Sequence, residues 1–307
     1  MNHGWTYRDR ILAAADGSTV LAYYARRYAH STAAEWRTRL VEGRITRNGR
    51  PAAAADALAA GDLLAWRRPP WEEPPVPRAF TVLYEDADLL AVDKPAGLPV
   101  LPGGGYVEHT LLHLLRLRTP GTPPVPLHRL GRGTSGVILF ARSACARSGL
   151  AAAFRDATAR ASGTVEKRYR ALTGPVPDLP DTVDIRTSIG PLPHPALGTV
   201  HAASPTGKPA YSRCRILRRG DRDTLWEIDL VTGRPHQIRI HLAAVGCPLL
   251  GDPLYAPGGL PRAFAGGRPA VPGDCGYLLH ACSLRFAHPR TREFLTITSP
   301  PPPALQA

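Results

Sequence analysis

Strand-forming runs, not helices, dominate the sequence between residues 81 and 300. Stretches such as GVILFAR (136–142), TLWEIDLVTG (224–233) and FLTITSP (294–300) are apolar and β-branched and end at Gly, Pro or charged residues, which is typical of strands. Helical stretches are few and do not alternate with the strands: HTLLHLLRL, SGLAAAFRDATAR and HQIRIHLAAVG. A doubly wound parallel sheet needs that alternation. We therefore expect an α+β fold with a mixed, largely antiparallel sheet over residues 81–300.

A second, smaller domain is predicted over residues 17–68. TVLAYYARRY places apolar residues at helical spacing, and Thr32 with Glu35 forms a capping-box pattern for a second helix. Asn48-Gly49 is a hairpin signal, and AAGDLLAW supplies a last strand. Residues 69–80 are Pro-dense and predict a semi-rigid linker. We expect residues 1–16 to be an N-terminal extension and residues 301–307 a frayed tail.

The charge balance points to a polyanionic partner. Lys and Arg number 38 against 25 Asp and Glu, a net charge of +13. A genomic bias toward Arg explains why only Lys94, Lys167 and Lys208 are lysines, but it does not explain the excess over acids. Nucleic acid is therefore favoured over a merely solvated basic face. We expect a cytoplasmic protein that does not enter the membrane, since no apolar run of about 18 residues and no secretory leader pattern occurs.

Several motif-like stretches do not fit their usual context. GRGTSG (131–136) matches a dinucleotide-binding pattern, but the strand-like VILFAR follows it where a helix is required. His236 and His241 are five residues apart, without the spacing of a zinc site, and the five Cys form no CxxC pair. We expect no metal and reduced thiols.

Six motifs occur in an order that resembles one enzyme family. They are YEDADLLAVDKPAGLPV (84–100), LHRLGRGTSGVILFAR (127–142), KRYRAL (167–172), GKPAYSRCRIL (207–217), TGRPHQIRIHLAAVGCPLLGDPLY (232–255) and LLHACSLRF (278–286). Together they resemble the RluA family of RNA pseudouridine synthases. The smaller domain is similar to the S-four-type RNA-binding module of a ribosomal protein. The resemblance implies isomerisation of uridine to pseudouridine in structured RNA such as rRNA or tRNA, without a cofactor or an obligate protein partner, by a monomer.

The resemblance also implies roles for individual residues. Tyr169 matches the Tyr that stacks on the base, and Arg239 matches the Arg that pairs with the catalytic acid. Arg129 matches the Arg that helps displace the flipped nucleotide. The catalytic acid itself belongs at the position of Gly131, where this chain has no carboxylate.

Three interpretations of Gly131 compete, and one of them, a related but different reaction, has no support in the sequence. Another carboxylate could serve, and Asp93 in VDKPAG and Asp252 in GDPLY are the acids inside motif loops. Alternatively, the chain is a non-catalytic RNA-binding protein of the same fold. Either way the cationic residues of the motifs and of the small domain are candidate RNA contacts: Arg129, Arg132, Lys167, Arg234, Arg26, Arg27, Arg37 and Arg39.

Overall fold

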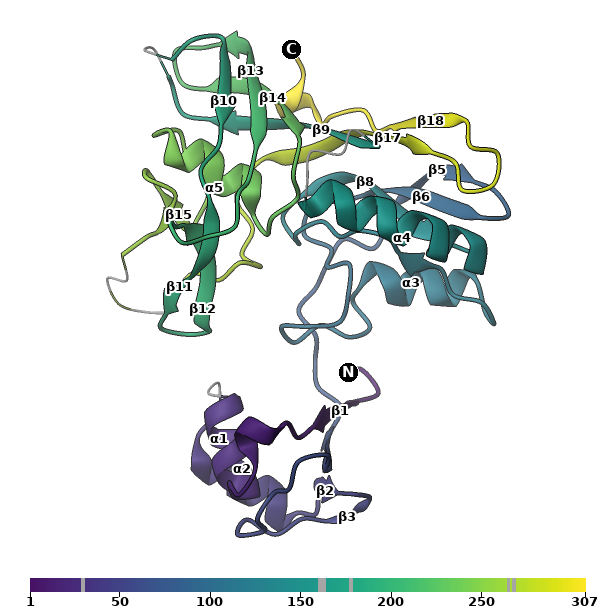
Figure 1. Ribbon diagram of the computed structural model, residues 1–307, viewed down its shortest axis with the longest axis vertical. Coiled ribbons are helices and arrows are strands. Elements are labelled where there is room, and N and C mark those ends of the chain that lie inside the picture. The colour runs from purple at the N-terminus through teal and green to yellow at the C-terminus, as the bar shows by residue number, and fades with distance from the viewer. Residues whose placement is uncertain (29–30, 160–163, 177–178, 264–265, 267–268) are drawn as a thin grey trace. The chain divides into compact units, whose positions relative to one another are not determined.

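The chain divides into two compact units, Met1–Glu73 and Pro74–Ala307. A computed structural model describes residues 1–28, 31–159, 164–176, 179–263, 266 and 269–307 (Figure 1). No helix in these residues is long and apolar enough to cross a membrane. Residues 74–80, the second part of the expected linker, carry no helix or strand.

The small unit packs two helices against a four-stranded sheet. Its strands are β1 (Trp5–Arg10), β2 (Ile45–Arg47), β3 (Arg50–Pro51) and β4 (Leu63–Arg68), in the order β1-β4-β2-β3. A short 3-10 turn η1 (Ala13–Ala15) leads into α1 (Val20–Arg27) and α2 (Ala33–Val41). The capping box at Thr32 and Glu35 is present, and Asn48 and Gly49 both have positive φ, as a hairpin turn of this type requires. The core centres on the buried rings of Tyr24, Trp36 and Trp66.

Both ends of the chain differ from the expected boundaries. Residues 1–16 include β1, which pairs antiparallel with β4 along its whole length and so belongs to the sheet. At the other end, η2 (Pro303–Leu305) buries Leu305 completely beside Leu172 and Leu225, and Arg170 donates a hydrogen bond to the Leu305 carbonyl. Neither segment shows apolar periodicity in the sequence, so no local pattern predicts these contacts.

One twisted, mixed sheet organises the large unit. The strand order is β10-β13-β14-β9-β17-β8-β6-β5, with β18 pairing β17 and β7 pairing β8. Among the described strands of this sheet only β17 and β8 run parallel, so the expected α+β class with a largely antiparallel sheet is confirmed. The strand bounds are β5 (Thr81–Glu85), β6 (Leu89–Lys94), β7 (Val125–Pro126), β8 (Ser135–Ala141), β9 (Val165–Thr173), β10 (Thr182–Ile185), β13 (Ser212–Arg219), β14 (Thr224–Leu230), β17 (Leu279–Ala287) and β18 (Phe294–Thr298).

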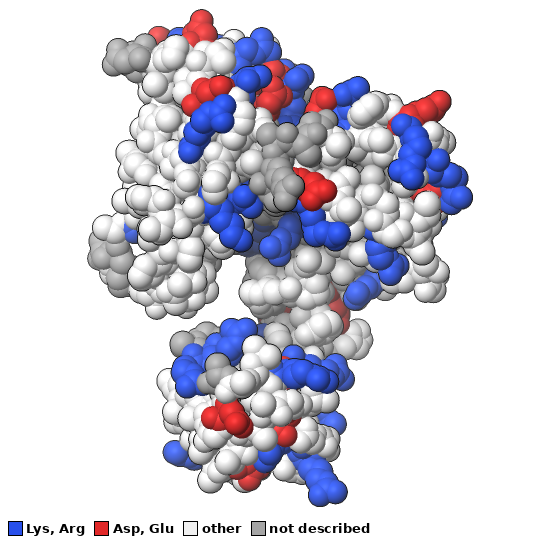
Figure 2. Space-filling model, viewed as in Figure 1, with Lys and Arg blue, Asp and Glu red and all other residues white. Residues whose placement is uncertain are grey.

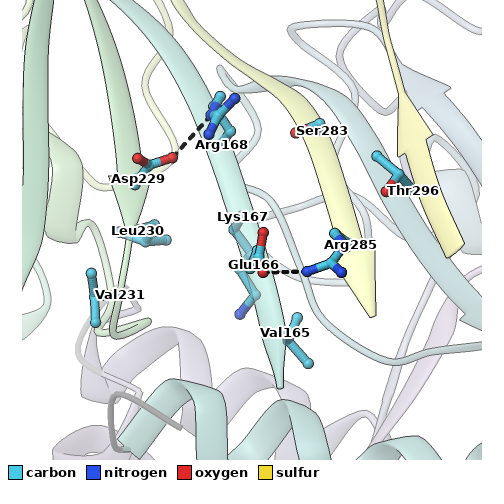
Figure 3. Close-up of a pocket in the computed structure, with 10 residues that line it drawn as sticks. All are labelled: Val165, Glu166, Lys167, Arg168, Asp229, Leu230, Val231, Ser283, Arg285 and Thr296. Carbon is cyan, nitrogen blue, oxygen red and sulfur yellow. Dashed lines mark hydrogen bonds and ion pairs between the residues drawn. The ribbon is translucent and has the colours of Figure 1, made fainter. Parts of the chain in front are cut away.

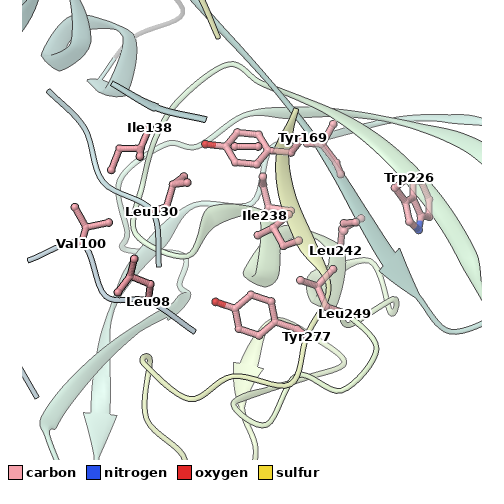
Figure 4. Close-up of a cluster of buried hydrophobic side chains, with 14 of the residues drawn as sticks. Leu98, Val100, Leu130, Ile138, Tyr169, Trp226, Ile238, Leu242, Leu249 and Tyr277 are labelled. Carbon is pink, nitrogen blue, oxygen red and sulfur yellow. The ribbon is translucent and has the colours of Figure 1, made fainter. Parts of the chain in front are cut away.

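The three predicted helices form and cover the sheet. They are α3 (Leu111–Arg118), α4 (Ala144–Ala159) and α5 (Gln237–Ala244). Two hairpins complete the unit: β11 (Ile189–His194) with β12 (Gly198–Ala203), and β15 (Tyr255–Ala256) with β16 (Leu260–Pro261). The largest buried cluster collects side chains from β6, β8, β9, β14 and α5, and it includes Tyr169 and Tyr277 (Figure 4). α4 covers a second cluster on β6 and β8 through Leu150 and Phe154.

Candidate active site

The loop that carries Gly131 is tied to the end of β6 by a buried cation. Lys94 donates hydrogen bonds from Nζ to the carbonyls of Pro95 and Leu98, at 2.8 Å each, and to that of Arg132 at 3.3 Å. The Gly97 amide donates to the same Arg132 carbonyl at 2.7 Å. Burial lowers the pKa of Lys94 to about 7. These bonds fix the path of the loop from residue 128 to 133.

The two glycines of this loop make room for an aromatic ring. A Cβ on Gly133 would lie 2.9 Å from Tyr277 Cζ, closer than atoms pack. A Cβ on Gly131 would lie 3.2 Å from the Tyr277 hydroxyl and 3.5 Å from Thr134 Oγ1. Gly131 does not have positive φ, so steric space and not backbone conformation distinguishes it. The phenol of Tyr277 therefore lies beside the place where a side chain at residue 131 would begin.

Arg239 is buried on α5 and forms a two-point ion pair with Asp252. Its Nε donates to Asp252 Oδ2 and its Nη2 to Oδ1, both at 2.7 Å, and Nη1 donates to the Pro272 carbonyl. Burial by itself would lower the pKa of Arg239, but the hydrogen bonds to Asp252 raise it above its usual value. The guanidinium lies 4.3 Å from the Tyr277 ring centre and 5.0 Å from that of Tyr255.

Asp252 is buried, and its carboxylate accepts four hydrogen bonds from the protein. Besides the two bonds from Arg239, its Oδ1 accepts from the backbone amides of Leu254 and Tyr255. Its side chain is 0% exposed. A carboxylate held in this way neutralises Arg239 and shapes the turn before β15, and it does not face a ligand.

Asp93, the other candidate acid, lies elsewhere. Leu90 and Val92 of β6 contact the cluster that contains Tyr169. Leu89 and Ala91 contact the cluster under α4. Because strand side chains alternate between faces, Asp93 shares the second face, and no contact joins it to Arg239 among the described residues. Arg239 and Gly131 both lie beside Tyr277, which belongs to the same buried cluster as Tyr169, and Asp93 lies on the other face of β6.

Tyr169 and Tyr277 flank the apolar side of the site. Tyr169 on β9 is 7% exposed, and burial raises its pKa. In Figure 4 the hydroxyls of both tyrosines point toward the side where Leu98, Val100 and Leu130 lie. An aromatic face backed by aliphatic side chains suits a planar base.

His236 stands at the start of α5 with an accepting nitrogen. Tyr255 donates its only hydroxyl proton to the His201 carbonyl at 2.7 Å, so His236 Nδ1 must donate to the Tyr255 oxygen, at 2.8 Å. Burial, aided by the charge of Arg239, lowers the pKa of His236 to about 3, which keeps the ring neutral. Its Nε2 therefore carries a lone pair.

The chain matches known proteins over most of its length. Residues 88–244 match the family model described as RNA pseudouridylate synthase. An uncharacterised RNA pseudouridine synthase of Synechocystis sp. is 46% identical over 93% of this chain and 95% of its own length. RNA pseudouridine synthase 5 of Oryza sativa is 39% identical over 99% and 89%. Ribosomal large subunit pseudouridine synthase D of Neisseria meningitidis serogroup B is 33% identical over 92% and 75%.

The chain belongs to the RNA pseudouridine synthase family. The resemblance to the RluA family predicted this correctly. The human RNA pseudouridylate synthase domain containing 1 has the same fold, with a TM-score of 0.57, 25% identity, and coverage of 76% of this chain and 89% of that one. The enzymes of this family are isomerases that act on RNA, so the basic charge and the site have a common explanation.

The predicted RNA contacts of the large unit differ in their exposure and in their hydrogen bonds. Arg129 is exposed beside Gly131, whereas Lys167 is buried on β9. Arg132 donates from Nε to the Gly273 carbonyl and from Nη1 to the Tyr106 hydroxyl, both at 2.6 Å, and Arg234 Nε donates to the Pro209 carbonyl. Arg132 and Arg234 thus brace loops. On its visible face, Figure 2 shows Lys and Arg side chains close together across the middle of the large unit.

The predicted RNA-binding arginines on α1 and α2 also differ in their exposure. Arg26, Arg27 and Arg37 are exposed. Arg39 instead lies 4.2 Å from the Trp36 ring centre and 4.9 Å from that of Trp66, and its Nη1 donates to Ser31 Oγ. Arg39 therefore supports the core of the unit.

Sequence reasoning missed Tyr277 and His236. Tyr277 stands one residue before the LLHACSLRF motif, in a Gly- and Pro-rich loop without periodicity. The only available signal was the unusual pair of glycines in GRG, which indicated that something approaches that backbone closely.

Proposed function

We propose that this chain isomerises uridine to pseudouridine in structured RNA, rRNA or tRNA, as a cytoplasmic monomer without an obligate protein partner. The observation that supports catalysis is the preserved setting of Arg239: buried, paired and pressed against the ring of Tyr277. An uncompensated cation at this depth would cost several kcal/mol. Asp252 removes that cost, and Arg239 stays beside the buried cluster that contains Tyr169 and Tyr277.

Asp252 does not replace the missing acid in this proposal. Both of its oxygens are occupied and its side chain is 0% exposed, so it cannot approach C1′ or C2′ of a ribose. It is a positioning residue for Arg239.

We assign the proton-handling role to the Tyr277 hydroxyl. Its oxygen is the polar atom nearest to the position of a Cβ at residue 131, at 3.2 Å, and its ring centre lies 4.3 Å from the Arg239 guanidinium. The reaction breaks the bond between C1′ and N1, forms one between C1′ and C5, and moves one proton from C5 to N1. A phenol that releases and recovers a proton serves this sequence without a net reactant.

Tritium release from uridine labelled at C5 in unmodified rRNA and tRNA transcripts tests the assignment. Tyr277→Phe should lower the rate about 100-fold or more while RNA affinity is retained. Asp252→Asn should also lower it, together with the melting temperature. A Tyr277→Phe rate within about threefold of the parent would show that the ring only packs.

Restoring a carboxylate is the complementary test. Gly131→Asp needs only a small shift of the Tyr277 hydroxyl, so the variant should fold. In the Tyr277→Phe background, Gly131→Asp should recover activity, because the new carboxylate then lies where the Tyr277 hydroxyl was. A double variant as slow as Tyr277→Phe alone would contradict the shared role of these two positions.

A non-catalytic RNA-binding role is the second candidate, favoured by one observation. Among the described residues, Asp252 is the only carboxylate that contacts Arg239, and it is fully engaged. No tritium release by the parent from any cellular RNA, with release only in Gly131→Asp, would establish this role.

A further inference from the structure

The sheet opens between β9 and β14 and leaves a hollow. The two strands pair from Thr224 and Thr173 to Asp229 and Arg168, but β9 starts three residues earlier, at Val165. Beyond the last pair, Leu230 and Val231 lead away from β9 (Figure 3). β17 still covers the other edge of β9. The gap encloses a pocket of about 370 Å³.

Lys167 is the one buried cation that lines this pocket. Its residue is 9% exposed, and its Nζ lies 5.4 Å from the Phe154 ring centre. No hydrogen bond or ion pair joins it to another of the described residues. Burying an ammonium without a partner is unfavourable, so the site is incomplete as it stands.

The remaining charged groups of the pocket satisfy one another. Arg168 pairs with Asp229 at 2.9 Å, and Arg285 pairs with Glu166 at 2.5 Å. The wall beside Lys167 is apolar, formed by Val165, Leu230 and Val231. The pocket therefore offers one uncompensated positive charge beside an apolar wall.

Lys167 links this pocket to the candidate active site, whereas Glu166 and Arg168, which also line the pocket, point to the opposite face of β9. Lys167 and Tyr169 are two residues apart on β9 and share a face. That spacing is about 6–7 Å along a strand, so Lys167 lies within reach of the nucleotide next to a base at Tyr169. A nucleotide neighbouring the target uridine would thus bring its phosphate to the ammonium.

We infer that the gap between β9 and β14 is a phosphate subsite, in which Lys167 binds the backbone of a nucleotide that flanks the target uridine. This rests on the proposed function only in taking RNA as the ligand. Lys167 suits the role because a compact ammonium binds phosphate as a point charge, while the apolar wall accepts the sugar or base. The unpaired edge of β9 adds main-chain groups at the same place.

Competitive acetylation tests the subsite. The chain has only three lysines, and Lys94 and Lys208 serve as controls for Lys167. Lys208 is exposed, and Lys94 is 0% exposed with three carbonyl acceptors. The intact protein is treated with limiting acetylating reagent, alone, with rRNA transcript, and with inorganic phosphate. Mass spectrometry then gives the acetylated fraction of each lysine.

Lys167 should react in the free protein despite its burial, and Lys94 should not. RNA should slow the acetylation of Lys167 by about fivefold or more, with inorganic phosphate acting more weakly and Lys208 unaffected by phosphate. An unreactive Lys167, or equal protection of Lys167 and Lys208 by phosphate, would overturn the inference.

A matched pair of substitutions gives the second measurement. Lys167→Met should weaken RNA binding about tenfold and reduce the salt slope of the affinity by about one, while Lys208→Met should leave that slope within error. Thermal melts check that both variants fold. Binding is measured without turnover, so failure of catalysis and failure of the subsite give separate results. A Lys167→Met protein that folds and keeps the parental slope would contradict the subsite.

Discussion

At the scale of single residues, the site depends on what two glycines permit. The ring of Tyr277 packs where a Cβ on Gly133 would stand, and its hydroxyl lies beside Gly131. Tyr277, from the loop before β17, thus occupies space that side chains at residues 131 and 133 would need. The carboxylate that neutralises Arg239 comes from a third segment, after α5.

Gly133→Ala should therefore destabilise the large unit by about 1–3 kcal/mol, because a rigid ring cannot yield to the added methyl group. Gly174→Ala is the control, since a Cβ there meets nothing within 4 Å and its φ is not positive. Urea unfolding measures both. Equal midpoints for the two variants would show that Tyr277 moves aside freely.

The pKa of Lys167 predicts how RNA binding depends on pH. Burial lowers it to about 8, so the ammonium loses its charge as pH rises through that value. The neighbouring Glu166, Arg168, Asp229 and Arg285 are paired, and the pKa of His128 is lowered to about 3 by burial, so none of them mimics this titration between pH 7 and 9. The affinity of the parent for RNA should fall more steeply over that range than that of Lys167→Met, in which Lys94, with a pKa of about 7, still titrates. Parallel profiles for the two proteins would contradict the assignment.

At the scale of elements, α2 shows that neighbouring cations on one helix serve different purposes. Arg37 is exposed, whereas Arg39 stacks on Trp36 and Trp66. The sequence pattern does not distinguish Arg37 from Arg39, because helical spacing does not show which side chain packs on an aromatic ring. We expect the exposed residue to act on RNA and the stacked one on stability.

Arg37→Ala should lower the salt slope of RNA binding by one at most and leave the melting temperature unchanged. Arg39→Ala should lower the stability of the small unit by about 1 kcal/mol or more, through lost stacking and the lost bond to Ser31. Filter binding at several salt concentrations and thermal melts separate the two effects. A salt slope that Arg37→Ala does not change would mean that this face is only solvated.

At the scale of the whole molecule, the last residues complete the large unit instead of fraying from it. Leu305 is 0% exposed against Leu172 and Leu225, and its carbonyl accepts from Arg170 of β9. This contact closes the end of the sheet opposite the Lys167 pocket. Leu305→Ala should cost about 2–4 kcal/mol in unfolding free energy. The exposed Leu197→Ala is the control and should cost little. Equal unfolding midpoints for the two variants would show that residues 301–307 are frayed, as the sequence predicts.

By itself the sequence determined the fold class, the three helices of the large unit, the capping box and hairpin of the small one, and the family, because these follow from local periodicity and ordered motifs. It also pointed to Gly131, Tyr169 and Arg239 as candidate site residues, but not to Tyr277. Only the tertiary structure decided their partners. Asp252 and Asp93 are both acids in motif loops, yet one is buried against Arg239 and the other lies on the far face of β6. Tyr277, Leu305 and the strand β1 gain their places through contacts with residues distant in the chain, and no local pattern encodes such contacts.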